Sequence, residues 1–211
     1  MAAMMRGIID IWREQMQRFG AQFQCISFDT CGAGRSDKPV PKGSYGVDRH
    51  AAVLDAVKVG KVLLVGHSMG GNIACRFYRS NPERVAGIIF VGSYVSGKQI
   101  DSVGNTLERI KAAVEMKLNR IDFYRQVGLP EEIAMEATKW PLYGINGNAQ
   151  SFMEFDASAE LGDITVPCLV VHGYEQPYCS VSRRKNYLVT GLLLECLVDS
   201  TSPAYLADLG S

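Results

Sequence analysis

Five apolar runs, separated by polar and glycine-rich stretches, set the pattern of this chain. They cover residues 23–28, 61–65, 84–91, 166–171 and 192–198. In the third run Ala86, Ile88 and Phe90 fall on one side, as the two-residue period of a strand requires. Short continuous apolar runs bounded by turn residues are typical of strands buried on both faces. The pattern therefore predicts a parallel β-sheet.

Helical patterns fill the spaces between these runs. Residues 68–80 predict a helix that stops at Asn81-Pro82, because proline cannot continue a helix. Strands that alternate with helices predict an α/β fold: a doubly wound, mostly parallel sheet covered on both faces. The length of 211 residues fits one domain, which we expect to span residues 1–211.

The longest gap between two predicted strands, at about 97–163, also reads as helical. One segment repeats apolar residues at three- or four-residue intervals, at Leu107, Ile110, Val114 and Leu118. A second segment covers 130–139. An insertion of this length predicts a helical lid over the carboxyl ends of the strands. Five of its aromatic residues line an apolar pocket or pack as core: Phe123, Tyr124, Trp140, Tyr143 and Phe152.

Charge and composition narrow the range of partners. Lys and Arg number 22, and Asp and Glu also number 22, so the formal net charge is zero. A neutral chain has no electrostatic attraction to nucleic acid or to anionic lipid, so neither is an expected partner. The basic run at 183–185 is too short to change this and reads as a solvated helix face.

Six cysteines and three histidines form no metal-binding spacing. No C-x-x-C pair occurs, and most cysteines stand in apolar runs, where cysteine behaves as a small buried hydrophobe. This usage predicts a reducing, intracellular, cytoplasmic location and no metal. Arg6 and Asp10 interrupt the first twelve residues, so no signal peptide is expected there, and no apolar run reaches membrane-spanning length.

The chemistry of the chain is concentrated in residues 65–71, Val-Gly-His-Ser-Met-Gly-Gly. This stretch contains a Gly-x-Ser-x-Gly motif between a predicted strand and a predicted helix. A serine hydroxyl is a poor nucleophile unless a sharp turn presents it beside a base and oxyanion donors. Gly66 and Gly70 suit such a turn, because side chains at these positions would collide across it.

Four stretches in a fixed order resemble the α/β-hydrolase superfamily, in its esterase, enol-lactonase and haloperoxidase-like branch. They are residues 28–39 (a D-x-x-G-x-G-x-S-D turn), 65–71 (the nucleophile elbow), 81–85 (Asn-Pro-Glu-Arg-Val) and 164–173 (a strand ending in His-Gly). The resemblance implies that Ser68 is the nucleophile and that the backbone N–H of Met69 is an oxyanion donor. It implies no cofactor and a small ester or lactone as substrate.

The family's catalytic acid stands in the loop after its seventh strand, usually as His-Gly-x-x-Asp. Here that run is His172-Gly173-Tyr174-Glu175-Gln176, with glutamine in place of the aspartate. Glu175 is the neighbouring carboxylate and the remaining candidate acid. Its side chain would have to come within hydrogen-bonding reach of the base.

The family's catalytic histidine lies after the last strand, where this chain has Thr201 or Ser202. A hydroxyl cannot accept and return a proton near neutral pH. Of the three histidines, His67 is expected to point away from Ser68. His172 is expected to make a structural hydrogen bond, and His50 is expected to lie on a flanking helix away from the strand ends. No general base is identified.

The N-terminal part also departs from the family. Residues 11–16 resemble the helix that follows the oxyanion loop, but no strand is predicted ahead of them. We therefore expect the first three strands of the family and the second oxyanion donor to be missing. Relative to the family pattern, the stretch between Tyr45 and Asp55 is shorter by about four residues, close to one helical turn. A decayed relative or an incomplete gene product would both explain these departures.

Two functions from different classes follow. One is a serine hydrolase that cleaves a small ester or lactone through an acyl-enzyme at Ser68. The other is a catalytically impaired homologue that binds a small apolar ligand or a protein partner. A cyclase or lyase on the same fold is a third possibility, because a fold does not fix a function.

Overall fold

The computed structural model describes residues 1–5, 9–40, 43–57, 60–102, 104–158, 160–173 and 194–198. Its strands are β1 (Ala2–Met5), β2 (Cys25–Phe28), β3 (Val62–His67), β4 (Val85–Val91), β5 (Cys168–Gly173) and β6 (Leu194–Val198). They form one sheet in the order β2-β1-β3-β4-β5-β6, and every pair is parallel. The predicted α/β fold with a parallel sheet is confirmed.

Helices connect successive strands. Those beside the sheet are α1 (Arg13–Phe19), α2 (Val47–Ala56) and α3 (Met69–Ser80). Those between β4 and β5 are α4 (Gly97–Asp101), α5 (Leu107–Glu115), α6 (Lys117–Gln126), α7 (Glu131–Glu136) and α8 (Leu142–Glu154). Short 3-10 turns stand at η1 (Ile9–Trp12), η2 (Pro82–Arg84), η3 (Ala137–Lys139) and η4 (Glu160–Asp163).

Two apolar clusters cover the sheet, and a third lies among the inserted helices. α2 and α3 pack with β3 and β4 around residues such as Leu64, Ile73 and Phe77. A separate cluster joins Trp12 to Val65 and to neighbouring strand residues. Burial of these side chains gives the sheet its stability, at roughly 25 cal/mol per Å² of apolar surface.

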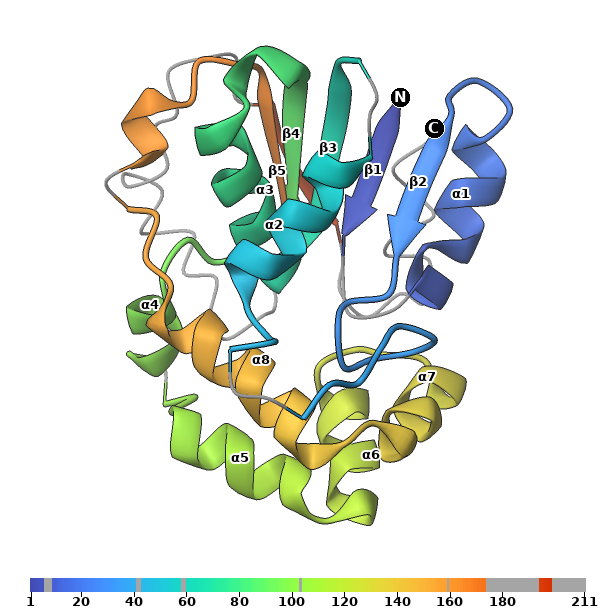
Figure 1. Ribbon diagram of the computed structural model, residues 1–211, viewed down its shortest axis with the longest axis vertical. Coiled ribbons are helices and arrows are strands. Elements are labelled where there is room, and N and C mark those ends of the chain that lie inside the picture. Colours follow the sequence, from blue (N-terminus) through green and yellow to red (C-terminus); the bar gives the residue numbers. More distant parts are fainter. Residues whose placement is uncertain are drawn as a thin grey trace.

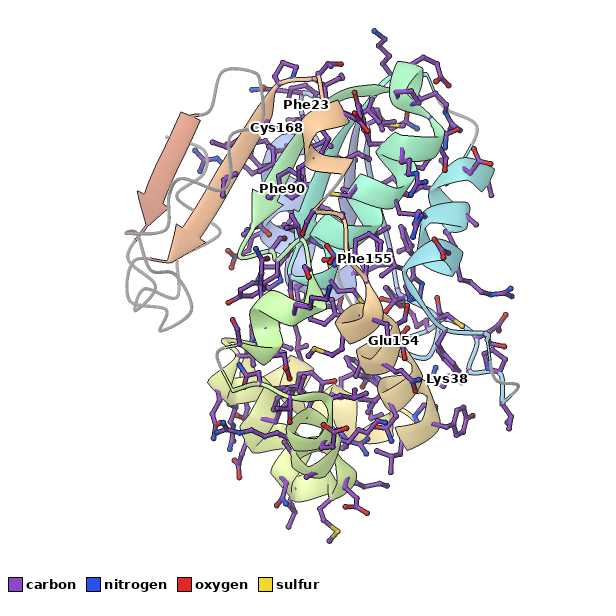
Figure 2. All side chains as sticks on the ribbon, turned by 90° about the vertical axis from the view of Figure 1, so that its left-hand side faces the viewer. Phe23, Lys38, Phe90, Glu154, Phe155 and Cys168 are labelled. Carbon is purple, nitrogen blue, oxygen red and sulfur yellow. The ribbon has the colours of Figure 1, made fainter. Side chains whose placement is uncertain are left out.

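The carboxyl ends of the strands face the inserted helices. In Figure 1 the arrowheads of β1 and β2 point toward α4–α8, which lie together below the sheet. Figure 2, turned by 90°, shows the same separation, with Glu154 and Phe155 where the chain leaves α8 and returns toward the sheet. In open α/β sheets the carboxyl edge is where ligands bind, so the insertion lies beside the expected site.

The N-terminal strand corrects one expectation. The prediction that no strand precedes the helix near 11–16 is wrong, because β1 pairs with both β2 and β3. Ala-Ala-Met-Met carries little strand preference of its own, so pairing on two sides imposes the extended conformation. The sheet therefore contains one of the strands that the sequence had led us to expect missing.

The inserted helices correct a second expectation. The apolar repeat from Leu107 to Leu118 predicts one continuous segment, but the structure has two helices separated by Met116. Met116 has an extended backbone (φ −84°, ψ 136°), so α6 begins in a new direction. Because neither glycine nor proline marks this break, the sequence gives no sign of it.

Candidate active site

Ser68 occupies the turn between β3 and α3. Its backbone angles are φ 52° and ψ −122°, and it is the one non-glycine residue with positive φ in the part of the chain that the structure describes. A side-chain-bearing residue in such a region carries a strain of roughly 1–3 kcal/mol. Strain of this kind needs surrounding contacts to maintain it.

Gly66 allows the turn to close. A Cβ atom on Gly66 would lie 2.5 Å from the carbonyl carbon and oxygen of Gly70 and 2.6 Å from the nitrogen of Gly71. These are backbone atoms of the first helical turn and cannot move aside. A side chain at position 66 would therefore collide across the turn, as the motif predicts.

Met69 begins α3 directly after Ser68. The first N–H groups of a helix have no intrahelical carbonyl to bind, and the helix dipole places partial positive charge there. The N–H of Met69 therefore belongs to the group that can bind an oxyanion next to Ser68. Within the described part of the chain, the side chain of Ser68 makes no capping hydrogen bond to the N–H groups of α3.

The end of β1 adjoins this turn from the other side. Met5 pairs with Gly66 in the register between β1 and β3. The connection that follows Met5, where the family resemblance puts a second oxyanion donor, lies outside the described residues at 6–8. The strand that leads to this connection is present, contrary to expectation.

Asp29 is a buried carboxylate that the sequence analysis did not single out. Its two oxygens accept the backbone N–H of Ile9 at 2.7 Å and of Arg35 at 2.8 Å. Asp29 therefore ties the start of η1 to the glycine-rich turn after β2, both at the carboxyl edge of the sheet. The sequence feature that could have indicated this role is the position of Asp29 as the first residue of the D-x-x-G-x-G-x-S-D motif.

The imidazole of His50 lies away from a catalytic position. It is fully buried and its Nε2 lies 2.9 Å from Oδ1 of Asn148 on α8. Burial lowers the pKa of His50. The expectation that His50 lies on a flanking helix holds for α2, but its ring reaches the inserted helices rather than staying remote from that edge.

His67 and His172 both stand at the ends of central strands. A Cβ on Gly92 would lie 3.8 Å from Nε2 of His67, which puts that imidazole at the carboxyl end of β4. His172 belongs to β5, and its side chain lies outside the described part. The candidate acid Glu175 also lies outside the described residues, as do Gln176, Thr201 and Ser202.

The inserted helices have their own core. Phe123, Tyr124 and Trp140 pack there, with ring centroids 5.3 Å apart for the first pair and 5.6 Å for Tyr124 and Trp140. These three aromatics therefore serve as core. Tyr143 is 44% exposed and donates its hydroxyl to the carbonyl of Lys38 at 2.9 Å.

Within the described residues, no cluster of His, Cys, Asp and Glu could hold a metal ion. Over the same residues, every helix is too short or too polar to span a bilayer.

Comparison with known proteins identifies the family. The profile of the alpha/beta hydrolase fold family matches residues 6–131, which is more than half of the chain. The chain belongs to the α/β-hydrolase family. The predicted superfamily is therefore confirmed, and the elbow at Ser68 lies inside the matched region.

Several relatives are similar over different lengths. A non-heme chloroperoxidase of Streptomyces lividans is 29% identical over 218 residues, covering 88% of this chain and 78% of that protein. Epoxide hydrolase 4 of Mus musculus is 32% identical over 84 residues, 38% of this chain. The match with epoxide hydrolase 4 spans 23% of that protein's length, so it covers a part of it only.

Solved structures share the fold at low identity. A bromoperoxidase from Bacillus anthracis superposes with a TM-score of 0.78 at 19% identity, over 98% of this chain and 87% of that one. The enol-lactonase from Burkholderia xenovorans LB400 gives a TM-score of 0.71 at 19% identity, over 99% and 86%. At these identities the likeness establishes the fold alone.

Proposed function

We propose that this chain is a serine hydrolase of small esters or lactones. Ser68 attacks the substrate carbonyl, the N–H of Met69 stabilises the oxyanion, and water releases the acyl group from the enzyme. The observation that carries the proposal is the strained backbone of Ser68 at a strand-to-helix turn. Such strain at a partly buried serine has no evident structural purpose, whereas a nucleophile at a sharp turn needs it.

The substrate class rests on the fold family and on its neighbours. Structures similar to this chain include an esterase from Exiguobacterium antarcticum and the enol-lactonase from Burkholderia xenovorans LB400. Both names describe cleavage at an acyl carbon, which the Ser68 elbow would perform without metal or organic cofactor. In this proposal Glu175 is the candidate acid, and the helices between 97 and 163 act as a lid over a small-molecule substrate.

A second candidate function is a non-catalytic homologue that binds a small apolar ligand or a protein partner. The burial of His50 favours this second function. Its imidazole is fully buried against Asn148 and therefore cannot exchange protons with Ser68 or a substrate. His67 lies against the end of β4, beside Gly92. The described residues thus offer Ser68 a turn and a helix N-terminus but no identified base.

The hydrolase and the non-catalytic homologue predict different results in an esterase assay. The purified chain and Ser68→Ala are compared for hydrolysis of nitrophenyl butyrate, with matched thermal unfolding curves to show that both are folded. A hydrolase gives saturable turnover that the substitution lowers at least a hundredfold, in line with the loss of an attacking group. Equal rates in the two proteins would contradict the hydrolase and leave the ligand-binding homologue.

A covalent probe gives an independent check of Ser68. An alkyl fluorophosphonate reacts with activated serines, so mass spectrometry of the wild-type protein is expected to show one adduct on the peptide containing Ser68. Ser44→Ala, at an unrelated serine in the loop before α2, serves as the matched control and should be labelled at the wild-type rate. Labelling that survives Ser68→Ala would assign the reactivity to another residue.

A further inference from the structure

Ser93 lies two residues beyond the end of β4, on the carboxyl edge of the sheet. Its hydroxyl oxygen is 2.9 Å from the carbonyl oxygen of Gly66 and 3.2 Å from that of Val91. One hydroxyl proton is therefore shared between carbonyls of two adjacent strands. The family resemblance assigns no role to this position.

Both carbonyls belong to the surroundings of Ser68. Gly66 is two residues before Ser68 on β3, and the carbonyl of Val91 accepts the backbone N–H of Ser68 at 3.0 Å. The hydroxyl of Ser93 thus contacts the strand that leads into the turn. It also contacts the group that holds the amide of Ser68 itself.

Ser93 also touches the helix on the far side of the turn. A Cβ on Gly71 would lie 2.6 Å from both Cβ and Oγ of Ser93, so the two residues are in direct contact. Gly71 in turn donates its N–H to the carbonyl of Ser68 at 3.0 Å. The side chain of Ser93 therefore contacts three groups around Ser68. These are the strand before Ser68, the carbonyl of Val91 that accepts the Ser68 N–H, and the first turn of α3.

We propose that Ser93 is a positioning residue that holds Ser68 in its strained conformation. A strained residue persists only where its surroundings determine its backbone, and Ser93 contributes three such contacts within one side chain. It acts through the backbone and does not touch the substrate. The catalytic consequence rests on the proposed hydrolase function, whereas the effect on the backbone of Ser68 does not.

The first test measures the backbone directly. Ser93→Ala removes the hydroxyl and keeps Cβ, and the exchange rate of the Ser68 amide is followed by NMR under native conditions. We expect that amide to exchange roughly tenfold faster, as the loss of one partly buried hydrogen bond allows, while the thermal midpoint changes little. Amides in the middle of α3 should keep their wild-type rates.

Ser102→Ala is the matched control, because Ser102 also donates its hydroxyl to a backbone carbonyl, that of Gln99 at 2.8 Å, but away from the turn. It should leave Ser68 exchange unchanged. If Ser93→Ala leaves the Ser68 amide at its wild-type rate, or if all amides accelerate in proportion to lost global stability, the proposal is overturned. Ser93→Cys, which keeps the volume and weakens the donor, replaces the alanine variant if that variant does not fold.

The second test measures reactivity at the site. Labelling of Ser68 by the fluorophosphonate is expected to slow about tenfold in Ser93→Ala and to stay unchanged in Ser102→Ala. A wild-type chain that resists labelling would contradict the proposed hydrolase, and the amide-exchange result would still decide the role of Ser93. Equal labelling of wild type and Ser93→Ala, with unchanged exchange, would remove Ser93 from the mechanism.

Discussion

At the scale of single residues, the hydrogen bonds of His50 define its protonation state. Nδ2 of Asn148 donates to the carbonyl of Cys31 at 2.9 Å, which turns Oδ1 of Asn148 toward His50. That oxygen can only accept, so Nε2 of His50 donates its proton to it. Among the residues that the structure describes, Nδ1 is buried without a hydrogen-bond partner, so a second proton there would have no acceptor and burial favours the neutral ring.

This arrangement predicts a pH-dependent stability. Burial lowers the pKa of His50 in the folded chain, with Arg49 acting in the same direction and the bond to Asn148 opposing it. An unfolded chain then binds a proton more readily than the folded one. The contribution of the neutral ring is therefore complete above the ordinary histidine pKa of about 6.5 and is lost as the pH falls toward the lowered value.

The test compares wild type with His50→Gln, which cannot titrate but keeps an N–H for Asn148. Urea unfolding at pH 7.5 and at pH 5 should show wild type losing more unfolding free energy than the variant between the two conditions. Parallel losses would mean that other groups cause the acid sensitivity. Because both proteins share all remaining titratable groups, the difference between them isolates His50.

At the scale of elements, the inserted helices are attached to the sheet domain at two places. The chain leaves and returns through a short antiparallel contact, in which Gly97 N–H binds the carbonyl of Phe155 at 2.9 Å and Ala157 N–H binds that of Val95 at 2.8 Å. α8 is also fixed along its length: the hydroxyl of Ser151 accepts the N–H of Val47 at 3.0 Å. These contacts make α8 the fixed part of the insertion.

The rest of the insertion is organised around one buried cation. Arg120 is 2% exposed and donates to the carbonyls of Val114, Ala137 and Trp140 at 2.8 to 3.1 Å. It thereby joins the end of α5 to the turn before α8 from its place on α6. A guanidinium can satisfy these carbonyls together because its donors are arranged in a fixed fork.

Arg120→Met is expected to loosen α5–α7 while the sheet stays folded. The substitution keeps apolar volume but removes the guanidinium donor from the carbonyls of Val114 and Trp140, at a cost of about 1–3 kcal/mol for each unsatisfied group. The carbonyl of Ala137 keeps the N–H of Trp140 at 3.2 Å. Hydrogen exchange by mass spectrometry should show peptides from 107–140 exchanging at least tenfold faster, with peptides from β3 and β4 unchanged. Arg109→Met, at an exposed arginine with one bond to the carbonyl of Gly104, is the control and should have little effect.

At the scale of the whole molecule, the sequence predicts those helices and strands whose bounds are set by local apolar runs and turn residues. The central strands β3 and β4 and the helix α3 stand within two residues of their predicted bounds, because continuous apolar runs and Pro82 mark them. The turn at Ser68 follows from its glycines. By contrast, the roles of Asp29 and Ser93 depend on which strands lie side by side, and a single sequence does not contain that pairing.

β1 shows the same limit and leads to the last prediction. Met4 pairs with Ser27 of β2 on one side and with Val65 of β3 on the other, so β1 joins an edge strand to the strand that carries the Ser68 turn. Proline at this position removes a ladder hydrogen bond inside the sheet and fixes φ away from the strand value. Met4→Pro is therefore expected to lower the free energy of unfolding by at least about 1–3 kcal/mol, the cost of one buried backbone group left without its partner.

Met4→Val, which keeps the N–H and favours a strand, should unfold at or above the wild-type midpoint in urea. Wild-type stability in Met4→Pro would mean that residues 2–5 do not contribute to the sheet. If the strand is required, the turn at Ser68 depends on a segment whose four residues show no strand pattern of their own. The order of the sheet, with β1 between β2 and β3, supplies the constraint that the local sequence lacks.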